Sequence, residues 1–457
     1  LASLGTFVAL VAFTLPFADL TTIAAALRTG PAVDAWILSS MSVGLAAALL
    51  IAGTLADLLG RRRMFVLGCV IRAATSWVGL LPHWSIFVAA RIGQGLGGAA
   101  IIAAGLGLIA AARPEPARRT AATAVWGAAL GGGIAVGPLL AVAAHQLGAW
   151  WAAYLATGLL AGATALLARV AAPETRPAST PGERRRPDVL GGLVFAVATV
   201  ILLTGLVQLR LAAGSPWPVL TIGLGLATFA GFVVLELRLR RPMLDPRLFR
   251  GPRFTAQVVA GFTTGIGIVG LCSIAVTYLI KGLGFTVLGA AATLLIWSGT
   301  SMVTALLARP LSRRISGGTQ LTLGLVGVAA GQALMIPADD FAGIAPGLLL
   351  AGVASGVLNA GLGREAVASV PAGQGGFGSG VNNTARYLGS AIGVTITGIL
   401  LLQGQPGTGP AEGRLAAGWS AAALTTTVLS VAGGVVVALL SRASARRDGP
   451  AARRAVS

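Results

Sequence analysis

The segment from residue 53 to residue 63 places one carboxylate beside three guanidinium groups in an otherwise apolar part of the chain. Its sequence is Gly53-Thr-Leu-Ala-Asp57-Leu-Leu-Gly60-Arg61-Arg62-Arg63. Asp57 can accept hydrogen bonds from the arginines or from the free N–H groups at the start of another helix. Gly53 and Gly60 allow two helix ends and a turn to approach closely. We therefore expect a latch in which Asp57, Gly60, Arg61 and Arg62 control a gate.

Two apolar segments flank this stretch, at residues 36–56 and 64–81. Each is long enough to cross the hydrocarbon core of a bilayer as a helix. The charged residues are therefore expected to form a tight turn between two membrane-spanning helices. Arginines are concentrated in cytoplasmic connections, so we place this turn on the cytoplasmic side.

The composition indicates the class of protein. Hydrophobic residues make up 55% of the 457 residues and charged residues only 10%. A soluble domain has no interior for so much apolar surface, so we predict an all-α polytopic membrane protein with the lipid bilayer as its surroundings. The formal net charge is +19, but the basic residues form short clusters between apolar segments. Such clusters are typical of cytoplasmic loops, and we expect no nucleic-acid partner.

Apolar segments of membrane-spanning length recur along the whole chain, and they predict fourteen transmembrane helices. With both termini in the cytoplasm, most basic residues fall in cytoplasmic connections. Only Arg28, Arg210, Lys281 and Arg414 are then left for the outer loops. The segments are 3–27, 36–56, 64–81, 84–112, 120–145, 148–171, 189–211, 217–237, 254–280, 285–308, 318–337, 342–363, 376–402 and 415–441.

Two polar, proline-containing connectors divide these helices into groups of six, two and six. The predicted parts are an N-terminal six-helix bundle (1–171), a cytoplasmic linker (172–188), a two-helix insert (189–237), a second linker (238–253), a C-terminal six-helix bundle (254–441) and a basic cytoplasmic tail (442–457). Residues 307–314 repeat the spacing of residues 55–62, with Arg309 in the place of Asp57. We interpret this repeat as a degenerate second latch, and two facing halves as the geometry of alternating access.

No pattern of a nucleotide-binding loop, an enzyme or a metal site is present. The cysteines, Cys69 and Cys272, lie far apart in predicted helices, so we predict no metal, no cofactor and no enzymatic activity. We interpret Glu236, Glu365 and Asp245 as partners in ordinary ion pairs. The scarcity of lysine beside so much arginine, alanine and glycine indicates the plasma membrane of a GC-rich bacterium. The chain begins with leucine, so we expect a preceding cytoplasmic segment and no cleavable signal peptide.

Polar and aromatic residues inside predicted helices are candidates for the binding of a small molecule. A lone arginine such as Arg91 normally faces an aqueous cavity or a partner, although backbone carbonyls or Gln94 can also satisfy it. On a later helix, Asn383, Arg386 and Tyr387 share one face. The predicted substrate-binding residues are Gln94, Tyr278, Trp297, Asn383, Arg386 and Tyr387.

The pattern around Asp57, G-x-L-a-D-x-x-G-r-r, resembles the signature loop between helices 2 and 3 of the major facilitator superfamily of transporters. The segment Arg91-Ile-Gly-Gln94-Gly95 resembles the R-x-x-q-G motif of proton-coupled members. The resemblance implies the major facilitator fold and a role for Arg91 in proton coupling.

A further motif, Gly133-Ile-Ala-Val-Gly137-Pro138, is similar to the G-x-x-x-G-P motif associated with exporters, although Ala141-Val142 replaces its final glycine pair. Glycines at this spacing allow close packing and Pro138 permits a bend, so we interpret Gly133, Gly137 and Pro138 as a pliable gate. The segments 380–389 and 241–250 resemble the fourteen-helix drug:proton antiporter family.

That resemblance implies a monomeric secondary active transporter, which exports hydrophobic or cationic small molecules in exchange for protons by alternating access. Two alternatives stay open from the sequence. One is a uniporter or importer of a small metabolite, because the exporter motif is incomplete. The other is a non-transporting membrane receptor or scaffold on the same fold.

The proton carrier that the resemblance implies, an acid in the middle of the first helix, is replaced here by Ala12. Asp19 lies seven residues later, which is about two helical turns, so it shares the face of Ala12. A proline inside a helix bends it, so Pro16 can turn Asp19 toward the cavity. We therefore predict that Asp19 carries the proton and that Arg91 favours its release. The alternative is a hydrated carboxylate at the interface.

Overall fold

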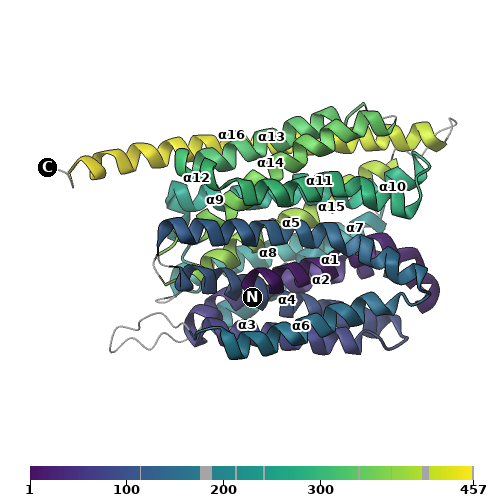
Figure 1. Cartoon of the computed structure of the whole chain (residues 1–457), viewed down its shortest axis with the longest axis horizontal. Helices are drawn as coiled ribbons and strands as arrows, with labels where there is room; N and C mark the ends of the chain where they lie inside the picture. Colours follow the sequence, from purple (N-terminus) through teal and green to yellow (C-terminus); the bar gives the residue numbers. More distant parts are fainter. Residues whose placement is uncertain are drawn as a thin grey trace.

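The computed structural model describes residues 1–113, 115–174, 188–211, 214–239, 242–337, 340–371, 373–403 and 411–454. Within these residues the chain is helical, without strands, and the long helices run side by side along the long axis of the molecule (Figure 1). Fourteen long helical units are present in this described part, when α9, η2 and α10 are counted as one. The prediction of an all-α fold is confirmed.

The first eight long helices follow one another along the chain. They are α1 (Ala2–Leu27), α2 (Pro31–Leu59), α3 (Arg61–Val78), α4 (Trp84–Ala112), α5 (Pro116–Gln146), α6 (Trp151–Ala171), α7 (Val189–Leu211) and α8 (Pro216–Arg238). Of the two expected linkers, residues 175–187 and 240–241 lie outside the described residues, and this includes Arg241. The described part of the second linker contains the 3-10 helix η1 (Pro246–Arg250).

The second half begins with a helix that changes its winding. α9 (Pro252–Thr264) continues through the π-helical turn η2 (Gly265–Val269) into α10 (Gly270–Lys281). The remaining elements are α11 (Val287–Leu307), the short α12 (Arg309–Arg314), α13 (Gly317–Leu334), α14 (Phe341–Ala368), α15 (Gly375–Gln403) and α16 (Ala411–Arg454). The expected basic tail from residue 442 continues α16, which extends past the other helices in Figure 1.

Twelve helices in the described residues are long and apolar enough to cross a membrane. The two shortest long helices, α3 and α13, fall outside this set. α3 begins with three arginines, and α13 contains five glycines and two glutamines among its 18 residues. Length and apolarity therefore support twelve spans, and fourteen remains a prediction.

The turn at the latch is shorter than the sequence predicted. Gly60 alone separates α2 from α3, with φ at 117°, a conformation that a residue with a β-carbon rarely adopts. The arginines from Arg61 onward do not form the turn, because they already belong to the first turn of α3. We call the end of the molecule that carries this turn and the α8–α9, α12–α13 and α14–α15 connections the basic end.

Two hydrophobic cores lie on either side of the centre, one mainly within α1–α6 and one mainly within α9–α16. Without a hydrophobic effect between helices in lipid, such packing depends on close backbone approach, which the 65 glycines permit.

α7 packs on α2 of the first half and on α15 of the second, whereas α8 packs mainly on α7 and stays exposed. α7 thereby positions Arg210 in its last turn, and the prediction of an outer loop for Arg210 is wrong.

Candidate gate and central cavity

A carboxylate of the first half closes onto a helix of the second half at the basic end. The N–H of Phe377 donates to Asp57 Oδ2 at 2.8 Å, and the N–H of Gly376 donates to Oδ1 at 3.2 Å. Both N–H groups belong to the first turn of α15, where no carbonyl of the same helix can accept them. Asp57 therefore caps α15 from another helix, and its negative charge lies at the positive end of that helix dipole.

Arg61 joins the same contact from the start of α3. Its Nε donates to Asp57 Oδ1 at 2.9 Å, and its Nη2 donates to the Gly373 carbonyl at 2.6 Å. Asp57 and Arg61 are 8% and 4% exposed. We call this cluster of Asp57, Arg61 and the start of α15 the latch. The sequence predicted that Asp57 can accept hydrogen bonds from the start of another helix, and this helix is α15. The role of the latch in gating stays a prediction.

The backbones of α2 and α15 touch beside the latch because both helices carry glycine there. A β-carbon at Gly376 would lie 2.8 Å from the Gly53 carbonyl oxygen, and one at Gly53 would collide with the carbonyl of Gly376. One turn further, a β-carbon at Gly380 would lie 2.5 Å from the carbonyl oxygen of Leu49. Only glycine fits this seam between the two halves.

The other arginines of the turn stay within the first half. Arg62 donates to the Ala172 carbonyl at 3.2 Å, and its Nε lies 3.6 Å from Glu174 Oε2. Arg63 lies 3.7 Å from the same carboxylate. Arg62 therefore holds the turn to the end of α6, and it reaches no group of α15 in these contacts.

The second half carries a buried carboxylate at the same end. Glu365, near the end of α14, pairs with Arg253 Nε of α9 at 2.7 Å and with Arg364 Nε at 3.6 Å. The ion pairing predicted for Glu365 is confirmed. The element that begins with Arg309 is the separate short helix α12.

The glycines of α5 hold this helix tightly against α1. A β-carbon at Gly133 would lie 2.6 Å from the Phe7 carbonyl oxygen, and one at Gly137 would lie 2.5 Å from that of Val11. Pro138 follows in the same helix and lines a cavity. The close packing that the glycines predicted is present, and a gating role for this segment stays a prediction.

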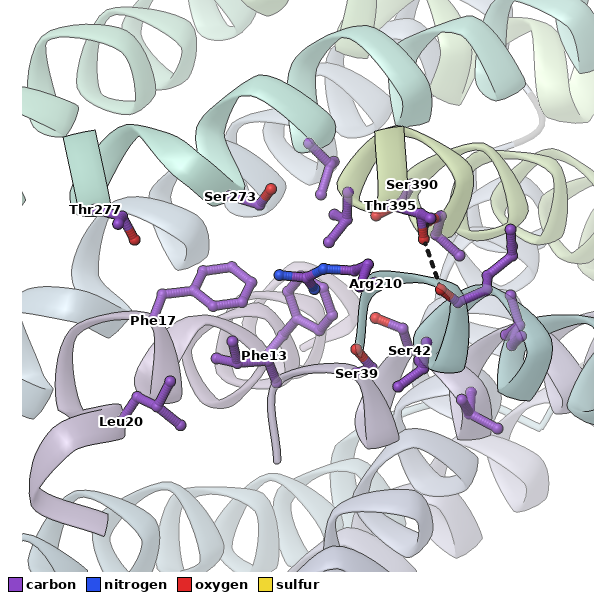
Figure 2. Close-up of a pocket in the computed structure, with 18 residues that line it drawn as sticks. Phe13, Phe17, Leu20, Ser39, Ser42, Arg210, Ser273, Thr277, Ser390 and Thr395 are labelled. Atoms are coloured by element: carbon purple, nitrogen blue, oxygen red, sulfur yellow. Dashed lines mark hydrogen bonds between the residues drawn. The ribbon is translucent and has the colours of Figure 1, made fainter. Parts of the chain in front are cut away.

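Two adjoining hollows lie between the halves and share the side chains of Phe13, Phe17 and Val269. We call them together the central cavity. Their volumes are about 100 Å³ and about 70 Å³. The first is bordered by α1, α2, α7, η2–α10 and α15 (Figure 2), and the second by α1, α5, η2–α10, α11, α14 and α15.

Comparison with known proteins agrees with this architecture. The sequence pattern that defines the Major Facilitator Superfamily matches residues 2–394. The chain belongs to the major facilitator superfamily. Its apolar helices and this membership make it a multi-pass membrane protein.

Among curated relatives of this superfamily member, the probable actinorhodin transporter of Streptomyces coelicolor is 30% identical over 380 residues, which are 80% of this chain and 65% of that protein. The multidrug resistance protein Stp of Mycobacterium tuberculosis is 28% identical over 371 residues, 80% of this chain and 68% of Stp. The multidrug efflux pump LfrA of Mycolicibacterium smegmatis is 28% identical over 397 residues, which are 85% of this chain and 76% of LfrA. This chain spans about two thirds of the length of the first two relatives.

Among solved structures, the human organic anion transporter MFSD10 superposes with a TM-score of 0.69. The match covers 95% of this chain and 97% of that one at 18% sequence identity. It shows that this chain has the same fold as MFSD10.

Arg91, the intramembrane arginine that the superfamily resemblance linked to protons, has three acceptors inside the first half. Nη1 donates to the Ala12 carbonyl at 2.6 Å and to Gln94 Oε1 at 3.1 Å, and Nη2 donates to the Phe13 carbonyl at 3.3 Å. This is the structural arrangement that the sequence left open as the alternative. Gln94 is engaged by Arg91 and Ser76 and does not line the central cavity.

Asp19 faces away from the central cavity, so the expectation that Pro16 turns it inward is wrong. The cavity-lining residues of α1 include Phe13 and Phe17. Asp19 follows Phe17 by two positions, which is about 200° around an α-helix. It is 1% exposed, so it is also not the hydrated interfacial carboxylate of the alternative. Its nearest polar neighbours include Thr22 and His145.

Of the remaining predicted binding residues, Trp297 and Arg386 line the central cavity and three others do not. Tyr278 stacks on Trp419 inside the second half, with ring centroids 4.7 Å apart. The Asn383 amide donates to the Ser379 carbonyl of its own helix. Tyr387 packs edge-on behind Phe13 at 5.7 Å. Their spacing placed them on helices correctly, but the face that meets the cavity depends on how the helices are rotated.

The cavity residues that sequence reasoning missed include Phe13, Phe17, Asn359 and Arg210. Phenylalanines in a membrane helix carry no distinguishing signal, because most face lipid or a core. Arg210 did carry a signal, because it is a single arginine at the end of an apolar segment. Such an arginine can belong to the helix as easily as to the loop.

Proposed function

We propose that this protein is a secondary active transporter that exports hydrophobic small molecules such as antibiotics, in exchange for protons, by alternating access. The observation that carries the proposal is a cavity between two helix bundles that a buried ionic latch closes at one end. We place the basic end in the cytoplasm with both termini, in a plasma membrane crossed by fourteen helices in groups of six, two and six, and we expect a monomer.

The lining of the central cavity supports a hydrophobic substrate. Phe13, Phe17 and Trp297 contribute aromatic surface, and serine and threonine hydroxyls contribute polar contacts. The relatives named as a probable actinorhodin transporter, a multidrug resistance protein and a multidrug efflux pump support outward transport of such compounds.

The latch supports alternation between two states. Asp57 and Arg61 connect α2 and α3 of the first half with α15 of the second through charge-assisted hydrogen bonds. Opening the basic end requires that these bonds break together. A compound can enter or leave the cavity only at the end that is open. Loading on one side of the membrane and release on the other therefore depend on which end is closed.

For the proton we propose Asp19, reached from the end opposite the latch. Its Oδ2 makes no hydrogen bond with the described residues, although the side chain is buried. The Thr22 hydroxyl beside it lies 3.1 Å from Nδ1 of His145, which is exposed. Tyr154 of α6 interacts electrostatically with both Asp19 and Arg91. His145 and Thr22 thus supply a route from the surface to a buried carboxylate, and coupling to the cavity runs through the packing of α1.

Reconstituted proteoliposomes test the proposal. We expect outward flux of a compound from an antibiotic panel that collapses when the pH gradient is removed. Flux that ignores the gradient would favour the uniporter, and no flux with any compound would favour a receptor or scaffold. For the proton carrier, Asp19→Asn should abolish substrate-induced proton flux while substrate exchange persists, and retained proton flux would contradict the role of Asp19.

A further inference from the structure

The charges that line the central cavity are all positive. Arg210 of α7 lines the first hollow and Arg386 of α15 lines the second, and no aspartate or glutamate is among the described lining residues of either. An organic cation in this cavity would meet two guanidinium groups and no carboxylate. In the low dielectric of a membrane protein such like-charge contact is strongly unfavourable.

Arg210 is set up to receive a ligand. Its Nε and Nη1 make no hydrogen bond with the described residues and are not exposed to solvent. Figure 2 shows the guanidinium reaching into the open part of the cavity, toward Phe13 and Phe17 and away from its own helix. The neighbouring hydroxyl of Thr395 is already engaged, since it donates to the Leu206 carbonyl at 3.3 Å. Guanidinium nitrogens that are buried without an acceptor are costly, and an acidic ligand group removes that cost.

The wall behind Arg210 leaves room for its side chain. A β-carbon at Gly398 of α15 would lie 2.8 Å from Arg210 Nε. The insert helix α7, which belongs to neither six-helix half, therefore delivers the cation to the cavity, and α15 accommodates it through a glycine.

Arg386 differs from Arg210 because it has an acceptor in the protein. Its Nη1 donates to Asn359 Oδ1 at 3.3 Å, and the side chain is 6% exposed. It adds positive potential to the second hollow, while Arg210 is the group with donors to spare.

We propose that the central cavity binds amphipathic organic anions, with the acidic group on Arg210 and a flat aromatic body against Phe13 and Phe17. This rests on the proposed export function and narrows its hydrophobic substrates to acidic ones, in place of the cationic compounds that the resemblance implied. A guanidinium binds a carboxylate or an ionised phenol through charge-assisted bonds, two at once for a carboxylate. The phenylalanine rings bind the aromatic part by offset or edge contacts.

Fluorescein and rhodamine 123 test the charge preference, because both have a xanthene ring system with a pendant phenyl ring, one as an anion and the other as a cation. Equilibrium binding to the purified full chain is measured by fluorescence anisotropy. We expect tighter binding of fluorescein. Arg210→Gln should weaken fluorescein binding about tenfold or more, as expected for a lost charge-assisted hydrogen bond, and leave rhodamine 123 binding unchanged or stronger. Arg210→Lys should retain most of the preference.

The matched control is Lys281→Gln, which removes one positive charge from an exposed position at the end of α10. It should leave both dyes unaffected. Equal or tighter binding of rhodamine 123 by the unmodified chain overturns the proposal without any variant, and so does unchanged fluorescein binding by Arg210→Gln. Because binding is measured without flux, failure of the export function appears separately. Absence of flux with every compound of the antibiotic panel contradicts transport, while tighter binding of fluorescein leaves the charge preference standing.

Discussion

Each half carries a buried carboxylate at the basic end, Asp57 in the first half and Glu365 in the second, and these two differ in where their partners are. Asp57 binds Arg61 of its own half and the first N–H groups of α15 in the other half. Glu365 binds Arg253 and Arg364, both within the second half. Both are acidic residues that pair with arginine. Only Asp57 makes a contact that must break when the halves separate.

This difference separates a gate from a scaffold by geometry alone. A bond that is present in both states of a transporter stabilises the fold but cannot shift the balance between the states. A bond present in one state shifts that balance by its full strength. We therefore expect substitutions at the Asp57 side to change opening, and substitutions at the Glu365 side to change mainly stability.

The largest effect is expected from Asp57→Asn. The substitution removes the charge that binds Arg61 and two backbone N–H groups, a loss of about 3 kcal/mol in the closed state, or about a hundredfold in the balance between states. The measurement is the rate of maleimide labelling of Ser379→Cys, which lies buried on α15 one turn beyond the latch, in a Cys69→Ser and Cys272→Ser background. The control is Asp245→Asn, which changes a half-buried carboxylate at the same end that binds the N–H of Arg247. An unchanged labelling rate would show that the latch does not hold the gate.

A smaller effect is expected from Gly53→Ala. The new methyl group would collide with the Gly376 carbonyl in the seam between α2 and α15, and overpacking of this kind costs about 2 kcal/mol, or about thirtyfold in opening. The same labelling assay reports it. Gly162→Ala is the control, because a β-carbon there would only make ordinary contact with Ala73 at 3.9 Å. If both variants label alike, the seam is looser than the structure shows.

The smallest effect is expected from Glu365→Gln. The Arg253 side chain is 50% exposed, so this ion pair contributes at most about 1 kcal/mol, and its loss should lower the melting temperature slightly. Labelling of Ser379→Cys should stay within about twofold of the parent, because neither arginine belongs to the other half. A rise in labelling as large as that of Asp57→Asn would remove the distinction between the two carboxylates.

The sequence predicted the parts of the molecule that depend on neighbouring residues. The Asp57 latch followed from one short pattern and from the unpaired N–H groups that begin every helix. The all-helical fold followed from apolar segments of membrane-spanning length. Both are local properties, so they can be inferred from short stretches of the sequence.

The predictions that failed depend on how each helix is rotated about its own axis. Asp19 was expected at the cavity, but it is buried beside Thr22 and His145. Tyr278 was expected to bind substrate, but it stacks on Trp419 within the second half. Arg210 was assigned to an outer loop although the predicted segment 189–211 already contained it, and the structure places it in the last turn of α7. Packing among several helices decides which face of a helix meets the cavity. The spacing of residues within one segment does not determine that face.

The π-helical turn η2 has a consequence for how this cavity can change over generations. A π turn holds one residue more than an α turn, so every side chain after it is rotated by about 100° relative to an uninterrupted α-helix. Cys272, Ser273 and Thr277 line the cavity after this turn. A deletion of one codon within residues 265–269 would restore plain α-helical winding and exchange the whole set of cavity-facing side chains of α10 at once. A single in-frame genetic event can thus replace one wall of the cavity, where point mutations would need many steps.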